Sequence, residues 1–261
     1  MPDDVDTETV ARWISEARQA VVLTGAGVST ASGIPDFRGP KGLWTTRPET
    51  ERLFSLDAYL EDPKVREQVW QMRVDHPAFT VEPSNAHQAL VELERRDLLH
   101  TLITQNIDGL HQAAGSSPAR VIEIHGTIHE VECLSCARRV PAAPVLQQVR
   151  DGDPDPRCTA CSGLQKAATI SFGQGLDRAL LQRAQDAATG ADLFLAVGTS
   201  LMVQPVALLP QMALDAQARL VIVNAEPTPY DHRAHARFFT DVSETLQQIV
   251  SHLDPVAPPR R

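Results

Sequence analysis

A glycine-rich loop over residues 25–39 directly follows an apolar run over 21–23. This pattern predicts a buried strand that leads straight into a loop able to hold nucleotide phosphates. Because Gly25 and Gly27 have no Cβ atom, the backbone amides of the loop can approach a pyrophosphate closely. Thr30 stands where the third glycine of the dehydrogenase fingerprint would fall. The loop therefore predicts nucleotide binding but disfavours hydride transfer.

The rest of the chain alternates between two kinds of pattern. Apolar, β-branched runs that end in polar or glycine-rich loops predict buried parallel strands over 20–23, 99–103, 121–124, 193–197 and 220–223. Helical patterns lie between them, over 5–18, 84–96, 177–188, 203–216 and 242–253, with Ser84 as an expected N-cap. The alternation predicts an α/β fold with a doubly wound parallel sheet, in which ligands bind at the carboxyl ends of the strands.

Two stretches interrupt this alternation. Residues 41–83, which contain several prolines, predict a helical insertion, and residues 127–171, which carry every cysteine, predict a small zinc-ribbon module. The Rossmann-like nucleotide-binding domain would then be discontinuous, built from residues 1–40, 84–126 and 172–254. Residues 255–261 are expected to form a frayed tail.

The cysteines form two hooks, Cys133-x-x-Cys136 and Cys158-x-x-Cys161, separated by 21 residues. The two-residue spacing lets both sulfurs of a hook reach one tetrahedral zinc ion, and four protein ligands leave no open position on the metal. We therefore expect one structural zinc ion. A pair of disulfides or a redox pair is the alternative, which a reducing compartment disfavours.

Composition narrows the range of partners and locations. The 261 residues include 24 basic and 33 acidic ones, for a formal net charge of −9. This balance argues against sequence-independent binding of nucleic acid and fits protein partners that present Lys and Arg. Because the sequence has no leader pattern and no apolar run of about 18 residues, we expect a cytoplasmic location and no membrane association.

Five motifs, taken in order, resemble those of the sirtuins, a family of NAD-dependent protein-lysine deacylases, in their bacterial form. They span nearly the whole chain. They are the loop 25–39, the segment Thr-Gln-Asn-Ile-Asp-Gly-Leu-His over 104–111, the pair His125-Gly126, the two cysteine hooks, and Gly198-Thr199-Ser200-Leu201 with Val203 and Pro205.

The resemblance implies a role for specific residues. His125, at the end of a predicted strand, matches the catalytic base of the family. Residues that match the NAD site are Gly25, Ala26, Gly27, Thr30, Asp36, Phe37, Arg38, Gln105, Asn106, Ile107, Asp108, His125, Gly198, Thr199, Ser200, Asn224, Asp241 and Val242. Without the resemblance, a histidine that caps a strand end and Asn and Asp as ordinary turn formers remain open interpretations.

The resemblance also implies a reaction in which NAD is consumed as a co-substrate. The acyl oxygen of an acyl-lysine attacks the ribose carbon that bears nicotinamide, and nicotinamide leaves. His125 then draws a proton through the ribose hydroxyls, and water releases free lysine and O-acyl-ADP-ribose. Acylated-lysine proteins or peptides are the expected partners. The alternatives are an NAD-consuming ADP-ribosyltransferase and a zinc-ribbon interaction module that only senses nucleotide.

The segment 169–177 resembles the substrate strand of the family, in which Phe172 and Gly173 would pair with the peptide backbone. Gln174 and Asp177 stand where the family has Glu and Pro. The backbone role tolerates these changes better than any side-chain role does. Peptide preference is therefore the property that the two departures affect most.

Trp70 and Arg73 lie three positions apart in a helical pattern over 65–73, and so are expected on one helix face. In the sirtuin branch that prefers malonyl and succinyl groups, a Tyr-x-x-Arg pair at this place binds the acyl carboxylate. Trp70 replaces the Tyr, so deacetylation is the expected main activity, and a deacylase that prefers acidic acyl groups is the alternative. A Trp packed beneath a solvated Arg is the competing structural interpretation.

Overall fold

The computed structural model describes residues 5–253, and the predicted tail at 255–261 lies outside them. Six strands form a parallel sheet in the order β3-β2-β1-β7-β8-β9. The strands are β1 (Ala20–Thr24), β2 (Thr101–Thr104), β3 (Val121–Glu123), β7 (Leu193–Val197), β8 (Arg219–Val223) and β9 (Ala236–Phe238). The predicted doubly wound parallel sheet is confirmed, and its order is that of a Rossmann-like fold.

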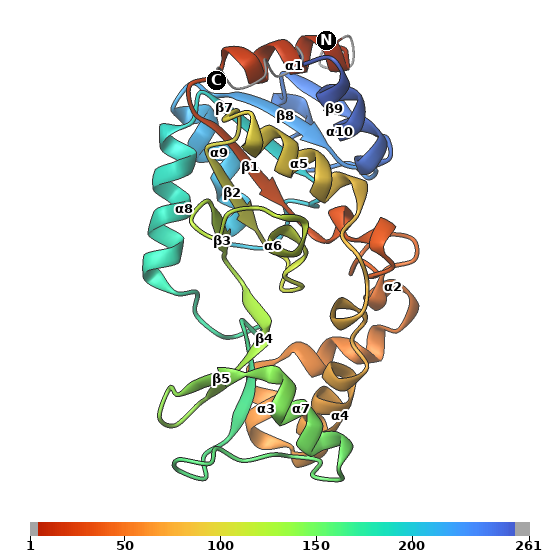
Figure 1. Cartoon of the computed structure of the whole chain (residues 1–261), viewed down its shortest axis with the longest axis vertical. Coiled ribbons are helices and arrows are strands. Elements are labelled where there is room, and N and C mark those ends of the chain that lie inside the picture. The colour runs from red at the N-terminus through yellow and green to blue at the C-terminus, as the bar shows by residue number, and fades with distance from the viewer. Residues whose placement is uncertain (1–4, 254–261) are drawn as a thin grey trace, which may run out of the picture.

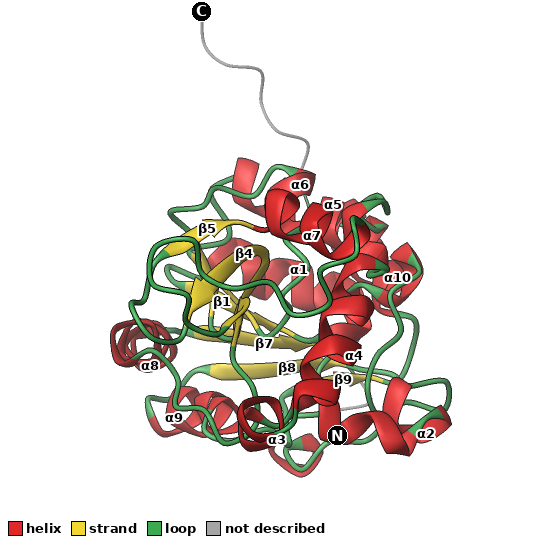
Figure 2. Ribbon diagram, turned by 90° about the horizontal axis from the view of Figure 1, so that it is seen from below, coloured by secondary structure: helices red, strands yellow, loops and turns green. Residues whose placement is uncertain are grey.

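Two apolar layers cover the sheet because successive strand residues point to opposite faces. Val22 and Leu195 face one layer, and Val21 and Phe194 face the other. Helices α1 (Thr7–Glu16), α5 (Asn85–Arg95) and α10 (Val242–Ser251) cover the first face, and α8 (Arg178–Gly190) and α9 (Leu209–Asp215) cover the second (Figure 2). Ser84 is the N-cap of α5, as predicted. Among the described residues, no helix combines the length and apolarity that a membrane crossing needs.

Two local predictions differ from the structure. The helix expected over 203–216 is divided into a 3₁₀ turn, Val206–Leu208, and the shorter helix α9. Pro210 sits in the first turn of α9, where its missing N–H costs nothing, so the helix begins beside it. Strand β9 was not predicted, because three residues are too few to establish a period.

A second part of the molecule lies at the end away from the N-terminus (Figure 1). It combines α2 (Leu43–Thr46), α3 (Leu56–Glu61) and α4 (Pro63–Val74) with an antiparallel sheet of β5 (Arg139–Pro141), β4 (Gly126–Cys133) and β6 (Gln165–Thr169), and with α7 (Ala142–Arg150). We keep the names helical insertion for residues 41–83 and zinc module for residues 127–171. The boundaries proposed from the sequence for the domains stay predictions.

Candidate active site

The site begins where strands β1 and β7 run side by side and their loops diverge. The N–H of Gly25 donates to the carbonyl of Val197 at 3.1 Å, and the N–H of Gly27 donates to the carbonyl of Gly198 at 2.9 Å. A Cβ atom at either Gly25 or Gly27 would lie only 2.7 Å from the backbone of Gly198. The glycines therefore allow two loops to touch at the point of the sheet where α/β proteins bind ligands.

A cavity of about 1330 Å³ opens at this point. Every residue that the sequence predicted for the NAD site lines it, together with Arg73, Phe172 and Gly173. Trp70 does not line it. Ligand pockets in proteins are commonly about 300–1,000 Å³, so this cavity has room for a dinucleotide and for a second, smaller group. Individual contacts of these residues with NAD stay predictions.

The imidazole of His125 is held in one tautomer by the backbone. Its Nδ1 atom lies 3.1 Å from the carbonyl oxygen of Gln105. Because a carbonyl only accepts hydrogen bonds, Nδ1 carries the proton, and Nε2 of the neutral ring keeps its lone pair. Burial lowers the pKa of His125 below its ordinary value, although the hydrogen bond to Gln105 opposes this. The neutral ring can thus act as a base through Nε2.

The chain beside His125 leaves no room for a side chain. Gly126 has a φ of +76°, and a Cβ atom there would collide with the carbonyl of Ala168 on β6. This glycine lets the chain pass directly from β3 into β4, which joins the large sheet to the zinc module. The position of His125 therefore depends on close packing between the two parts of the molecule.

A buried polar network joins the loops after β1 and β2. The hydroxyl of Ser29 donates to Asp108 Oδ2 at 2.7 Å, and Asn106 Nδ2 donates to Ser29 Oγ and to the Gly25 carbonyl, each at 3.1 Å. All three side chains are buried. The network makes one wall of the cavity rigid. Ser29 was not singled out from the sequence, although a hydroxyl inside a glycine-rich loop was the available signal.

Polar contacts also link the loops after β2 and β7. Gln105 Nε2 donates to Thr199 Oγ1 at 2.7 Å. At the next strand, Asn224 Nδ2 donates to the carbonyl of Glu226 at 2.7 Å. Asp241, at the N-cap of α10, accepts from the N–H of Glu244 at 3.0 Å. These predicted site residues thus also hold the loops that form the cavity.

An aromatic cluster covers another side of the cavity. The ring of Trp44 packs on Phe37, Phe54 and Phe172, with centroid distances of 4.8, 5.7 and 5.5 Å. The Arg38 guanidinium lies 4.6 Å from the centre of the Trp44 ring. Trp44 and Phe54 were not predicted from the sequence, because the cluster forms only when Phe172, from a distant segment of the chain, packs on Trp44. The cluster connects the glycine-rich loop to the predicted substrate segment.

The substrate segment is less extended than the sequence suggested. The N–H of Phe172 donates to the Phe54 carbonyl at 2.8 Å, and its carbonyl accepts from Leu56 at 2.9 Å. Gly173 has a φ of +85° and lies in a turn that Gln174 closes by accepting from the N–H of Ser171 at 3.2 Å. The main-chain groups of Phe172 are therefore already bonded, and Gly173 is where the chain turns.

Asp177 and Gln174, the two departures from the family pattern, both have local structural roles. The Asp177 carboxylate accepts from the N–H groups of Ala179 and Leu180 at 2.8 and 2.9 Å, and so caps helix α8. An acidic N-cap stabilises a helix by satisfying free amides and by its charge. Both side chains thus bond to backbone in this segment.

Trp70 and Arg73 lie on α4, and both are buried, with 1% and 7% of their surface exposed. Trp70 packs against Val131, Val145 and Leu146 of the zinc module. Arg73 lines the cavity, and burial lowers its pKa to about 10. The interpretation of a solvated Arg above a packed Trp is therefore wrong for the Arg: only the Trp belongs to the core.

Arg73 has no carboxylate within ion-pair distance among the residues that the structure describes, and its Nε is buried without a partner there. His76, also on the cavity wall, was missed by sequence analysis. Its Nδ1 accepts from the N–H of Ala78 at 3.2 Å, so the ring proton is on Nε2. Burial lowers the pKa of His76 to about 4, so this ring is neutral.

The four cysteine sulfurs meet in the zinc module, all within 4.8 Å of one another. Cys133 and Cys161 are 3.5 Å apart, and Cys136 and Cys158 are 3.8 Å apart. A zinc ion about 2.3 Å from each of four sulfurs in a tetrahedron requires sulfur separations of roughly 3.8 Å. The donor set and its spacing therefore fit one zinc ion.

The two hooks also share one backbone geometry. The residues that follow the second cysteine of each hook, Ala137 and Ser162, have φ values of 57° and 58°. Their N–H groups donate to the carbonyls of Cys133 and Cys158 at 2.9 and 2.8 Å. A hydrogen bond from the backbone N–H of Cys136 lowers the pKa of the Cys133 thiol, as backbone donors around a metal hook do for a thiolate.

The fold and the site together define a class of protein. A parallel sheet in this order, with a glycine-rich loop at its switch point and a four-cysteine module, is a Rossmann-like nucleotide-binding protein with a metal centre. The profile of the Sir2 family matches residues 25–205. The chain belongs to the Sir2 family.

Relatives of known name cover most of the chain. A Streptomyces coelicolor protein named NAD-dependent protein deacetylase 2 is 49% identical over 213 residues, which are 82% of this chain and 88% of that protein. A Haloarcula marismortui protein named NAD-dependent protein deacetylase is 42% identical and covers 96% of this chain and 97% of its own length.

Solved structures agree with this assignment. A Sir2 structure with a p53 peptide and NAD⁺ has a TM-score of 0.85 at 33% identity, over 95% of this chain and 98% of that one. A Sir2 structure bound to an acetylated peptide has a TM-score of 0.84 at 32% identity, with the same coverage.

Because the four cysteines are expected to hold a structural zinc ion, we expect the protein to lose stability when it loses the metal. Replacing Cys133 by Ser, or removing metal with a chelator, should lower the thermal unfolding midpoint by more than about 5 °C. A destabilisation of about 2 kcal/mol already shifts a chain of this size by roughly 4–8 °C, and metal binding in such modules is coupled to folding. Circular dichroism and metal analysis measure both effects. Thr159→Ala, a change inside the other hook at a residue that is no metal ligand, should change neither, and a metal-free protein with an unchanged midpoint would contradict a structural zinc ion.

Proposed function

We propose that this chain is an NAD-dependent protein-lysine deacylase, with deacetylation as its main activity. It transfers the acyl group of an acyl-lysine to ADP-ribose and releases nicotinamide. The observation that carries the proposal is the position of His125. This residue lines the same cavity as the glycine-rich loop, and its Nδ1 is bonded to the Gln105 carbonyl, so that Nε2 keeps the free lone pair. The names of the bacterial and archaeal relatives support the same activity.

The residues of the cavity suit NAD. The loop with Gly25 and Gly27 lines the cavity at the strand ends, where α/β proteins bind phosphates, and Asn224 provides an amide at a strand end for the adenosine ribose. Asp108 has a buried carboxylate that can accept from the nicotinamide carboxamide. Bound NAD supplies the nicotinamide leaving group and the ADP-ribose acceptor. Phe37 is suited to shield the sugar carbon, because Trp44 and Phe54 hold its ring.

His125 supplies the proton-transfer step. Its Nδ1 proton is engaged by the Gln105 carbonyl, so only Nε2 is available to take a proton from a ribose hydroxyl. The fixed tautomer means that no ring reorientation is needed before the transfer. Acyl-lysine peptides would approach along Gly173, and the net charge of −9 favours basic peptides over nucleic acid. A cytoplasmic location is part of this proposal.

Replacing His125 by Ala tests the proposal directly. The variant should fold and bind NAD as the wild type does, but acyl transfer should fall by about 10²–10⁴-fold, because general base catalysis contributes that much. Mass analysis of the products measures it. Near-normal deacylation by the variant would contradict the assignment, and ADP-ribosylated protein in place of free lysine and acyl-ADP-ribose would favour the transferase.

The pKa of His125 predicts the acid limb of the pH profile. The active ring is neutral, so activity should rise with pH as the ring loses its proton. Since burial lowers the pKa below the ordinary value of 6.5, the midpoint of this rise in kcat/KM should lie below pH 6.5. Rates measured from about pH 5 to 8 locate it. A midpoint above 6.5 that disappears in His125→Gln would contradict the predicted direction.

A second candidate activity is the removal of acidic acyl groups, and Arg73 favours it. Its guanidinium is buried at the cavity wall without an anionic partner among the described residues. An unpaired buried cation is costly, so a ligand carboxylate there would be well bound. Trp70, however, lies in the core and offers the cavity no hydroxyl or N–H. We therefore rank acetyl above succinyl.

Acetyl- and succinyl-peptides, assayed with NAD, test this ranking. The wild type should turn over the acetyl-peptide faster. Arg73→Met should leave that rate within about threefold but lower succinyl turnover roughly 10- to 100-fold, since a charge-assisted bond contributes about 1.5–3 kcal/mol. Arg47→Met, a change of an exposed cation at the same cavity, is the control and should affect both little. Faster succinyl than acetyl turnover in the wild type would reverse the ranking.

A further inference from the structure

Helix α4 presents three residues along one face toward other parts of the molecule. Arg66, Trp70 and Arg73 have the spacing i, i+4 and i+7, which puts them on one side of a helix. Arg66 contacts the loop before the second cysteine hook, Trp70 packs on α7 and β4, and Arg73 lines the cavity. The distance from Arg66 to Arg73 along the axis is only about 10 Å.

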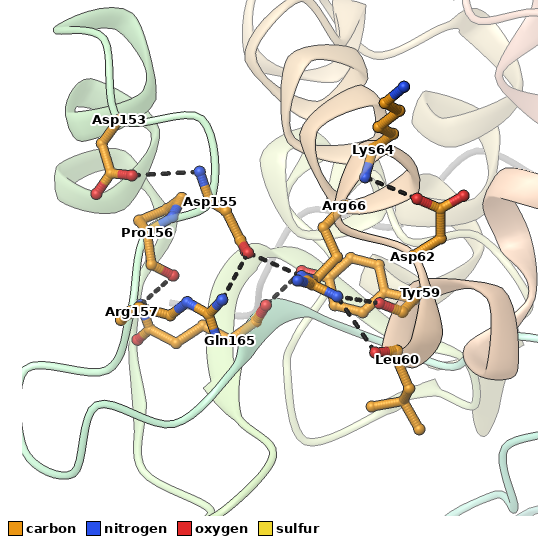
Figure 3. Close-up of polar contacts among 10 residues, drawn as sticks. All are labelled: Tyr59, Leu60, Asp62, Lys64, Arg66, Asp153, Asp155, Pro156, Arg157 and Gln165. Atoms are coloured by element: carbon orange, nitrogen blue, oxygen red, sulfur yellow. Dashed lines mark hydrogen bonds and ion pairs between the residues drawn. The ribbon is translucent and has the colours of Figure 1, made fainter.

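Arg66 forms hydrogen bonds to neighbours on both sides (Figure 3). Its Nε donates to Asp155 Oδ2 at 2.8 Å, and its Nη1 donates to the carbonyls of Tyr59 and Leu60 at 3.1 and 3.2 Å. The Arg66 and Asp155 side chains are only 6% and 14% exposed. Asp155 lies three residues before Cys158. The buried ion pair therefore ties α4 to the chain that holds one pair of metal ligands.

The other cysteine hook also contacts the helical insertion. Leu134, inside the first hook, packs against the buried cluster of Tyr59, Val65 and Val69. The hydroxyl of Tyr59 donates to the carbonyl of Gln165, the residue of β6 that pairs with Cys133. Burial raises the pKa of Tyr59 well above its ordinary value, so the hydroxyl keeps its proton and donates. The first hook and the loop before the second hook thus both contact α4. Helix α4 carries Arg73 at the part of the cavity that is proposed to hold the acyl group, which we call the acyl end.

We propose that Arg66 is a positioning residue that couples the metal centre to the acyl end of the cavity. With zinc bound, the loop around Asp155 is fixed, and Arg66 holds α4 in place. The cavity wall that α4 supplies is then fixed as a whole; its residues are Gln68, Gln71, Met72 and Arg73. Because coupling between two sites is reciprocal, loss of this pair should weaken both metal retention and acyl-lysine binding. NAD binding should change little, because most of its predicted residues lie in loops that follow strands of the large sheet and none lies on α4. The part that concerns acyl-lysine rests on the proposed function.

Arg66→Met tests the coupling, and Arg157→Met is its matched control. Arg157 contacts the same oxygen of Asp155 at 2.9 Å but is 47% exposed, so its loss should matter little. In Arg66→Met the buried Asp155 loses its closest enclosed cation. We expect zinc release to a chromogenic chelator to accelerate at least about fivefold, and KM for an acetyl-peptide to rise by a similar factor. The dissociation constant of NAD should stay within about twofold, and Arg157→Met should leave all three within about twofold.

Arg66→Lys is a second, milder variant that keeps the test valid if Arg66→Met fails to fold. It keeps the charge but lacks the fork that reaches Tyr59 and Leu60 as well as Asp155, so intermediate effects on zinc release and KM are expected. Unchanged zinc release in folded Arg66→Met, or an equal weakening of NAD and peptide binding, would overturn the proposal. Zinc release is measured without substrate. If the wild type had no deacylase activity, the proposed function would be refuted. The rates of zinc release from the wild type and Arg66→Met would still test whether Arg66 stabilises the metal centre.

Discussion

The close contact between the loops after β1 and β7 is the constraint on which the site depends. Two glycines on one loop touch the backbone of Gly198 on the other, at distances that a side chain would not permit. This contact lies at the switch point of the open sheet. Beyond it, the loops diverge and leave a crevice at the ends of the strands. Every predicted nucleotide contact then falls on one cavity, because each follows a strand of the same parallel sheet.

The cavity is rigid where chemistry requires it. Buried hydrogen bonds among Ser29, Asn106 and Asp108 join two loops, and a backbone carbonyl fixes the tautomer of His125. Groups held in this way need little reorganisation when a substrate binds. The aromatic cluster around Trp44 is different in kind, since ring packing holds the glycine-rich loop by shape and not by directed bonds.

The zinc module and the helical insertion share one interface, although residues 84–126 separate them in the chain. Trp70 and Leu134 cross it with apolar contacts, and Arg66 crosses it with a buried ion pair. The metal needs no open coordination position in this arrangement. A zinc ion bound by the four cysteines would hold two short loops that otherwise have too little core to order themselves.

The sequence by itself determined the parts whose physics is local. The glycine loop, the two cysteine hooks, the N-cap at Ser84 and the alternating strands follow from residue chemistry within a few positions. Only the tertiary structure decided which of Trp70 and Arg73 reaches the cavity, because their spacing places both on the same helix face. Trp70 packs against α7 in the core, and Arg73 lines the cavity. The tertiary structure likewise engaged the backbone of Phe172 with Phe54, more than a hundred positions away. Local periodicity says which face a residue occupies, but packing against distant segments decides what that face meets.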